Sequence, residues 1–112
     1  FAAISAAQSV ELIREAKQKG LNVTCGVTVG HLYFTDQDLV GFDSYLKASP
    51  PFRSVADRTA LWEGLLDGTI DVIVSDHHPQ DVESKNLEFD LADVGMISLQ
   101  TFFPTLCAAK PD

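Results

Sequence analysis

A short apolar run that ends abruptly in polar residues constrains this sequence more than any other feature. Residues 72–74 are Val-Ile-Val, and Ser75, Asp76, His77 and His78 follow directly. Consecutive β-branched residues favour a strand buried on both faces of a parallel sheet, and such sheets carry functional groups at the carboxyl ends of their strands. The run therefore predicts a strand that delivers Asp76 to a site. A solvated polar loop after the strand is the alternative interpretation.

Strand-like and helix-like segments alternate along the chain. Strands are predicted at residues 1–5, 22–29, 45–48 and 72–74, and helices at 6–19, 35–40, 54–67 and 95–109. Residues suited to helix caps precede the first three helices, including a capping box at residues 5–8, and a glycine follows each. The last helix is expected to be buried and kinked near Pro104. Such alternation favours parallel βα units.

Length, charge and cysteines narrow the function classes. The chain of 112 residues is at most one domain, residues 1–112, and its formal charge of −8 argues against nucleic acid or an anionic membrane surface as partner. No run approaches the roughly 20 apolar residues that span a bilayer, and no secretory leader pattern is seen. Cys25 and Cys107 lie in apolar runs, which predicts buried reduced thiols and a cytoplasmic protein. Because Phe1 begins in mid-pattern, we expect a piece of something longer.

Two further stretches hold candidate residues. His31 comes just after the strand-like residues 22–29, where a histidine is either a ligand or a hydrogen-bonded structural residue. Residues 79–93 are dense in carboxylates, and we interpret them as a surface loop rather than a metal-binding cluster.

Five segments follow one another as a series along the chain. They read AIS at residues 3–5, CGVTVGHL at 25–32, ASPPFR at 48–53, DGTID with SDHHPQ at 67–71 and 75–80, and GMISLQT at 95–101. In order and spacing they resemble the HVS, CEVTPHHL, VNPPLR, DGTID with TDHAPH, and GxxGLET motifs of the dihydroorotases, a family of the amidohydrolase superfamily. The resemblance implies an α/β fold, namely a partial TIM-like barrel of the metal-dependent hydrolase type with about four βα units, the last four strands of eight.

The resemblance also implies an activity and roles for single residues. The family opens the cyclic amide dihydroorotate reversibly to N-carbamoyl-aspartate, a zinc-dependent step of pyrimidine biosynthesis. Asp76 matches the family's metal ligand and general base, and His31 matches a metal ligand. Ser49 and Gln80 stand at positions that contact substrate. One or two zinc ions are expected in the intact protein, with further ligands outside this chain, so the chain alone is expected to be inactive.

Departures from the family pattern, which also include Gly26, Val29 and Gly30, keep alternatives open. Ala3 stands where the family has a metal-ligand histidine, and a methyl group cannot bind zinc. Ser49 replaces an asparagine and Gln80 replaces a histidine, although glutamine still donates a hydrogen bond. The alternatives are a catalytically inactive scaffold subunit for aspartate transcarbamoylase and a hydantoinase- or allantoinase-type hydrolase. We also expect open sheet edges to pair with a second copy or with the missing half of the barrel.

Overall fold

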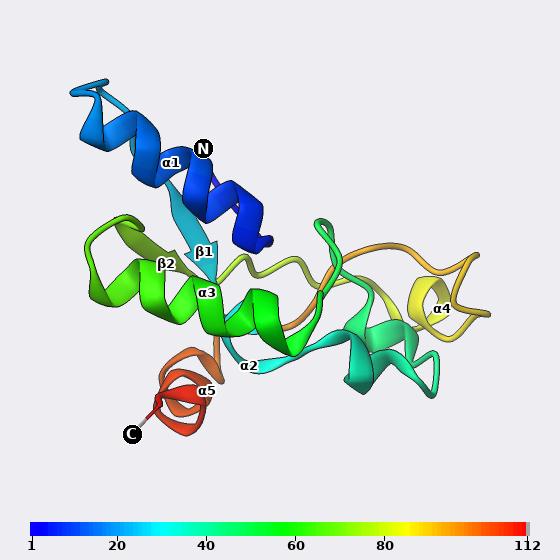
Figure 1. Ribbon diagram of the computed structural model, residues 1–112. Helices are drawn as coiled ribbons and strands as arrows, with labels where there is room; N and C mark the ends of the chain where they lie inside the picture. The colour runs from blue at the N-terminus through cyan, green and yellow to red at the C-terminus, as the bar shows by residue number, and fades with distance from the viewer. Residues whose placement is uncertain (112) are drawn as a thin grey trace.

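Two short parallel strands form the centre of the computed structural model, which describes residues 1–111. Strand β1 (Gly26–Thr28) pairs with β2 (Val72–Val74), and Val27 lies opposite Ile73. Figure 1 shows the two strands side by side and pointing the same way, with α1 (Ala7–Gln18) and α3 (Val55–Leu66) running past them. The carboxyl ends of both strands therefore open toward the same edge of the molecule.

The hydrophobic core lies between these strands and the two long helices. α1 and α3 contact each other directly, and both are 12 residues long. The core residues come from α1, β1, α3 and the segments beside them, and comprise Ile4, Val10, Ile13, Cys25, Val27, Leu32, Leu61 and Ile70. Burial of one such aliphatic side chain stabilises a fold by roughly 1.5–3 kcal/mol. The helices are thus held against the strands chiefly by apolar contacts.

Several predicted helix ends are confirmed. The hydroxyl of Ser54 accepts a hydrogen bond from the N–H of Asp57 at the start of α3. Gly20 and Gly68, which follow α1 and α3, have φ angles of 78° and 85°, a conformation that glycine adopts without steric cost. The predicted turn after Thr35 forms as the 3-10 helix η1 (Asp36–Leu39), and the N–H of Thr35 donates to the Asp38 carboxylate at 2.8 Å.

The predicted start of α1 is wrong. The N-cap is Ala6 rather than Ser5, and its side chain has no oxygen for a capping hydrogen bond. Asp57 from the start of α3 instead accepts the N–H of Ala7 at 2.8 Å, and the Ser5 hydroxyl accepts Nε of Arg53 at 2.7 Å. Tertiary contacts therefore replace the local capping box predicted at residues 5–8.

Among residues 1–111, two of the four predicted strands form as regular elements. Residues 1–5 run beside β1 without strand geometry, with the Ile4 N–H donating to Gly26 at 3.0 Å. The strand predicted at residues 45–48 is wrong, because Ser44–Leu46 forms the 3-10 helix η2, in which the N–H of Tyr45 donates to the Asp43 carboxylate. The strand predicted at 22–29 is shorter than expected, since α2 (Val29–Tyr33) begins directly after it. The chain is α/β with parallel pairing, and four complete βα units are not seen within these residues.

The predicted C-terminal helix is also shorter and more exposed than expected. α5 (Phe102–Ala109) holds eight residues, none of them buried, and residues 95–101 precede it as a loop. Pro104 lies in its first turn, where the missing N–H removes no helical hydrogen bond. Cys25 is buried as predicted. Cys107 on α5 is exposed, so the predicted burial of this second thiol is wrong. None of the helices in residues 1–111 has the length and apolarity to cross a membrane.

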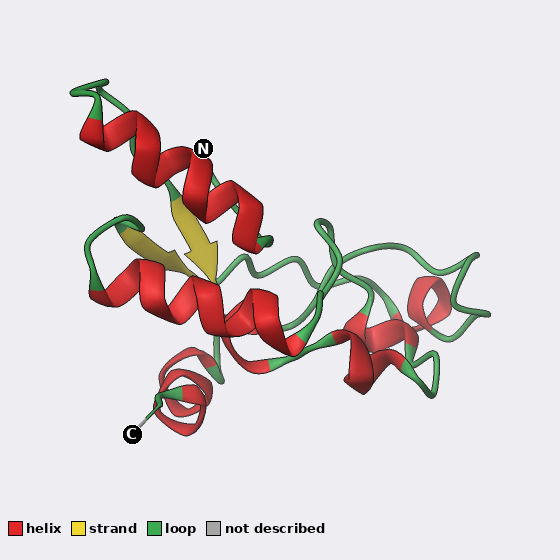
Figure 2. Ribbon diagram, viewed as in Figure 1, coloured by secondary structure: helices red, strands yellow, loops and turns green. Residues whose placement is uncertain are grey.

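The predicted acidic surface loop holds one short helix and one buried cation. α4 (Val82–Lys85) forms a single turn at the far end of the molecule in Figure 2. Lys85 is 2% exposed, and its Nζ donates to the backbone oxygens of Asp93 and Gly95 at 2.8 and 3.0 Å. Burial lowers the pKa of Lys85. The loop therefore folds around this lysine.

Asp67, at the end of α3, links this helix to α1. Hydrogen bonds from Thr69, together with Arg14 of α1 at 2.7 Å, lower the pKa of Asp67 to about 2. A carboxyl group whose pKa is lowered on folding stabilises the fold above its unfolded pKa, about 3.9, and the contribution is lost as the pH falls through the folded value. Because the side chain of Asp67 is 44% exposed, we expect its ion pair with Arg14 to contribute less than about 1 kcal/mol to the free energy of unfolding.

Replacing Asp67 by Asn should therefore lower the unfolding temperature of the intact protein at pH 6 and leave it nearly unchanged near pH 2. Thermal unfolding followed by circular dichroism at both pH values measures the difference. Equal unfolding temperatures of the wild type and Asp67→Asn at pH 6 would show that the contacts of Asp67 with Arg14 and Thr69 contribute no net stability.

Candidate functional site

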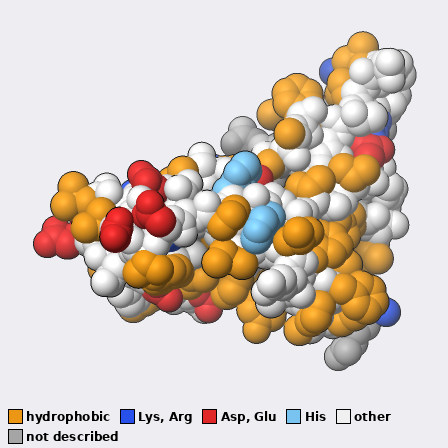
Figure 3. All heavy atoms as spheres, turned by 180° about the vertical axis from the view of Figure 1, so that it is seen from behind, with side chains coloured by type: hydrophobic (Ala, Val, Ile, Leu, Met, Phe, Trp, Pro, Cys, Tyr) orange, Lys and Arg blue, Asp and Glu red, His pale blue; other side chains and the backbone are white. Residues whose placement is uncertain are grey.

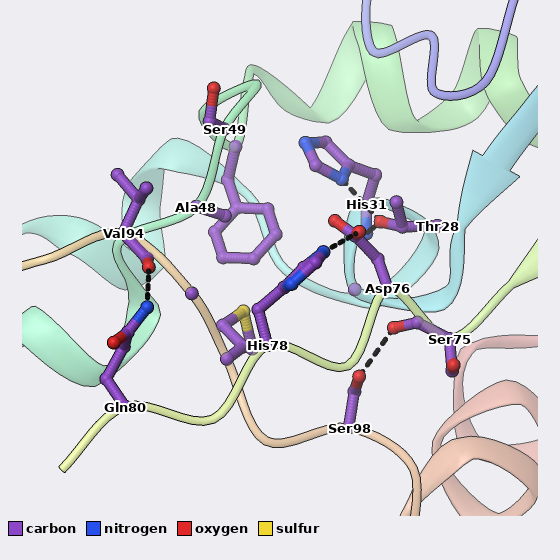
Figure 4. Close-up of a pocket in the computed structure, with 14 residues that line it drawn as sticks. Thr28, His31, Ala48, Ser49, Ser75, Asp76, His78, Gln80, Val94 and Ser98 are labelled. Carbon is purple, nitrogen blue, oxygen red and sulfur yellow. Dashed lines mark hydrogen bonds and ion pairs between the residues drawn. The ribbon is translucent and has the colours of Figure 1, made fainter.

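A cavity of about 300 Å³ lies at the carboxyl ends of the two strands. Its wall combines residues that follow β1, residues that follow β2, and two loops that are distant in sequence. The four residues predicted for the site all line it, namely His31, Ser49, Asp76 and Gln80. Figure 4 shows these side chains around one opening. The structure thus brings the predicted residues together, while their chemical roles stay predictions.

Asp76 lies two residues beyond β2 and points into the cavity (Figure 4). Its φ angle of 51° falls in the left-handed region, which non-glycine residues occupy at a cost of order 1–3 kcal/mol and which aspartate tolerates better than most. Its Oδ1 lies 2.9 Å from Nε2 of His78. The backbone turn and this contact together fix the direction of the carboxylate.

The sequence motifs did not predict His78 as a residue of this site. It lines the cavity opposite Asp76, and its side chain is 66% exposed. The dihydroorotase motif that residues 75–80 resemble has an alanine at this position. The doubled histidine directly after an expected catalytic aspartate was the available signal for a second imidazole in the site.

The loop after β2 is held by a second loop, residues 95–99. Nδ1 of His77 accepts the N–H groups of Ser98 and Leu99 at 3.0 and 3.1 Å, so the hydrogen of this ring lies on Nε2 in the neutral form. The hydroxyl of Ser98 donates to the backbone oxygen of Ser75. These contacts on both sides of Asp76 restrict the backbone that carries it.

Gly95 allows the two loops to approach closely. The N–H of His78 donates to the backbone oxygen of Met96 at 2.9 Å, and a Cβ on Gly95 would lie 2.4 Å from the oxygen of His78. The φ angle of Gly95 is 135°, which side-chain-bearing residues rarely adopt. The cavity wall therefore requires glycine at this position.

His31 lies inside the cavity wall and is 4% exposed. Its Nδ1 is 2.6 Å from the hydroxyl oxygen of Thr28, and its Nε2 is 2.9 and 3.2 Å from the backbone oxygens of Pro50 and Pro51. Burial lowers the pKa of His31, which favours the neutral ring. Both ring nitrogens thus have partners within the protein.

Ser49 and Gln80 lie at the edge of the cavity, apart from Asp76 (Figure 4). Nε2 of Gln80 donates to the backbone oxygen of Val94 at 3.2 Å. Ser49 precedes Pro50 in residues 48–52, which we call the proline loop. Both residues line the cavity, and their predicted contacts with a substrate stay predictions.

The donors in this chain do not fit a zinc site by themselves. Zinc in proteins takes three or four nitrogen, sulfur or oxygen ligands, and within residues 1–111 no three such side chains converge on one point. Asp76 offers a suitable oxygen, whereas Ala3 offers nothing and the ring nitrogens of His31 are engaged in hydrogen bonds. The metal roles of Asp76 and His31 stay predictions, and no chemical step is derived through a metal below.

Curated proteins similar to this chain include dihydroorotases. That of Bacillus subtilis is 50% identical over 103 residues, which cover 92% of this chain and 24% of that protein. That of Pelotomaculum thermopropionicum is 50% identical over 101 residues, covering 90% and 24%. No family model matches the chain. The chain spans about a quarter of the length of the curated relatives it matches.

Solved structures of hydrolases share the fold. An L-hydantoinase (dihydropyrimidinase) from Arthrobacter aurescens is similar with a TM-score of 0.86 and 33% identity, over 94% of this chain and 24% of that one. A dihydroorotase from Saccharomyces cerevisiae, in complex with 5-fluoroorotic acid, matches with a TM-score of 0.83 and 18% identity, over 97% and 31%, and shows the fold alone. By its sequence, this chain is a homologue of the dihydroorotases over 92% of its own length.

Proposed function

We propose that this chain supplies part of the active site of a dihydroorotase, which opens dihydroorotate reversibly to N-carbamoyl-aspartate. The observation that carries the proposal is the position of Asp76 in a cavity at the carboxyl end of β2, within a sequence half identical to dihydroorotases. Because the chain spans about a quarter of those relatives, the other groups of the site would come from residues beyond it.

In this proposal residues 1–112 are the C-terminal part of a (β/α) barrel of the amidohydrolase type. The surface agrees with such a role, since Val72 of β2 is 53% exposed and Phe103 of α5 is 69% exposed. Figure 3 shows apolar side chains gathered on the face that also carries histidines. A larger barrel would cover much of this apolar surface.

Asp76 is the proposed general base. Hydrolysis of an amide requires removal of a proton from the attacking water and delivery of a proton to the departing nitrogen. One carboxylate near both atoms performs both transfers in turn. Because His78 pairs with Oδ1 of Asp76, Oδ2 is the oxygen proposed to accept the proton.

Ser49 and Gln80 are the proposed substrate contacts. Dihydroorotate carries a carboxylate and ring amides, which accept and donate hydrogen bonds, and a hydroxyl and a carboxamide can satisfy both kinds of group. Any zinc held by the intact protein would need its remaining donors from residues beyond this chain, with Asp76 as the ligand proposed here.

A hydantoinase is the second candidate function. It is favoured by the similarity to an L-hydantoinase at 33% identity and by the changes at positions 49 and 80, where the dihydroorotase pattern has other residues. A five-membered hydantoin ring presents the same type of cyclic amide to Asp76.

A comparison of substrates tests the proposal. The intact protein should hydrolyse dihydroorotate with a kcat/KM at least about tenfold above those for hydantoin and dihydrouracil, a difference of about 1.4 kcal/mol in transition-state binding. A preference for hydantoin would assign the second function. A folded protein that hydrolyses none of the three would support the scaffold reading that Ala3 suggests.

A further inference from the structure

The three hydrogen-bond partners of His31 connect two separate parts of the cavity wall. Thr28 is the last residue of β1, whereas Pro50 and Pro51 belong to the proline loop. His31 itself lies in α2, directly after β1. The imidazole therefore bridges the end of the strand and a loop about 20 residues further along the chain.

The chemistry of these partners fixes the tautomer of His31. Backbone oxygens only accept hydrogen bonds, so Nε2 carries the ring hydrogen and donates it to the proline loop. Nδ1 is then an acceptor and receives the hydroxyl hydrogen of Thr28, whose oxygen in turn accepts the N–H of His31 at 3.2 Å. The lowered pKa of the buried ring agrees with this neutral form. No lone pair of the ring remains for a metal ion in this arrangement.

The proline loop depends on such contacts because Pro50 and Pro51 have no N–H to donate. At these two residues the backbone can be held only through its oxygens, and both oxygens lie within hydrogen-bond distance of Nε2 of His31. The ring of Phe52 packs against His31, with 4.9 Å between ring centroids, and is 4% exposed. Ser49 lies directly before the two prolines and lines the cavity. A shift of the loop would therefore displace Ser49.

We propose that His31 is a positioning residue that holds the proline loop, and with it Ser49, in place at the cavity, rather than a metal ligand. The proposal rests on the proposed function for the role of Ser49 toward substrate. It reassigns His31 from the metal to the recognition of the cyclic amide.

Three variants of the intact protein test this role. His31→Phe removes all three ring hydrogen bonds at similar volume, His31→Gln keeps an N–H donor of similar reach, and Thr28→Val removes only the hydroxyl. His31→Phe should raise the KM for dihydroorotate about tenfold and change kcat less than about threefold, because the hydrogen bonds that hold the proline loop are lost while the reacting groups stay in place. His31→Gln should restore most of the KM, and Thr28→Val should raise it about threefold.

The zinc content of the purified variants separates the two roles of His31. We expect all three variants to hold as much zinc per protein as the wild type, measured by plasma mass spectrometry. Loss of zinc in both His31→Phe and His31→Gln would show that His31 is a ligand and would overturn the proposal. An unchanged KM in all three variants would overturn it as well. If His31→Phe does not fold, the other two variants decide by the same criteria.

A proteolysis measurement tests the role of His31 independently of the proposed enzymatic function. If the wild type hydrolyses no cyclic amide, the proposed function fails, but the position of the loop is still measurable by tryptic cleavage after Lys47 and Arg53. His31→Phe should be cut there at least about fivefold faster than the wild type, and His31→Gln at nearly the wild-type rate. Equal rates for the wild type and His31→Phe would show that the imidazole does not hold the loop.

Discussion

Replacing Asp76 by Asn in the intact protein is expected to lower the kcat for dihydroorotate by at least about 10³-fold, within the range found for general bases. Asparagine has the same size but accepts no proton, so the transfer from water is lost. It also tolerates the φ angle of 51° at this position. Unfolding temperature and far-ultraviolet circular dichroism should therefore stay close to those of the wild type.

Glu63→Gln is the matched control for this variant. Glu63 is an exposed carboxylate on α3 and lies outside the cavity, so its neutralisation should leave kcat unchanged. Steady-state kinetics of both variants at one pH provides the comparison. Retained turnover in Asp76→Asn would remove Asp76 from the mechanism, whatever its place in the cavity.

Replacing Gly95 by Ala is expected to destabilise the protein by about 3 kcal/mol and to disrupt the cavity wall. The added Cβ would lie 2.4 Å from the backbone oxygen of His78, and the φ angle of 135° adds strain for any side chain. The contact must open, which separates the N–H of His78 from the oxygen of Met96. Asp76 then loses a neighbouring support, so kcat/KM should fall as well.

Gly41→Ala is the control for this substitution. A Cβ at Gly41 would meet no atom within 4 Å, and the residue has no left-handed φ angle. Its free energy of unfolding should change by less than about 0.5 kcal/mol. Urea unfolding of the two variants provides the measurement. An unfolding free energy for Gly95→Ala within 0.5 kcal/mol of the wild type would show that residues 78 and 95 separate without cost, at about the precision of the method.

The parts of the fold that sequence predicts are those set by local pattern. α3 begins at the cap of Ser54 and ends before Gly68, and β2 forms at the predicted apolar run. The expected burial of this run on both faces is wrong, since Val72 is 53% exposed. The wrong predictions occur where a contact with residues outside the local sequence pattern determines the secondary structure. Asp43 caps a 3-10 turn at residues 44–46, which read as a strand, and Asp57 of a distant helix replaces the expected cap of α1.

The candidate site was predictable through motifs rather than through contacts. The resemblance to the dihydroorotases pointed to His31, Ser49, Asp76 and Gln80, and these line one cavity. The hydrogen bonds of His31 to the proline loop and the pairing of His78 with Asp76 leave no periodic signal in the sequence, because they join residues by geometry alone. Lys85 shows the same limit, since a lysine in an acidic loop is expected to be solvated and is instead buried.

The most direct test of this account is the ring opening of dihydroorotate by the intact protein with added zinc, followed by the loss of ring absorbance and by detection of N-carbamoyl-aspartate. We expect the wild type to turn over dihydroorotate and Asp76→Asn to have lost this activity. Turnover by the wild type would mean that the protein functions without a histidine at position 3. A folded protein with no turnover of dihydroorotate would contradict the central claim, and the scaffold or another cyclic amide would then be the better interpretation.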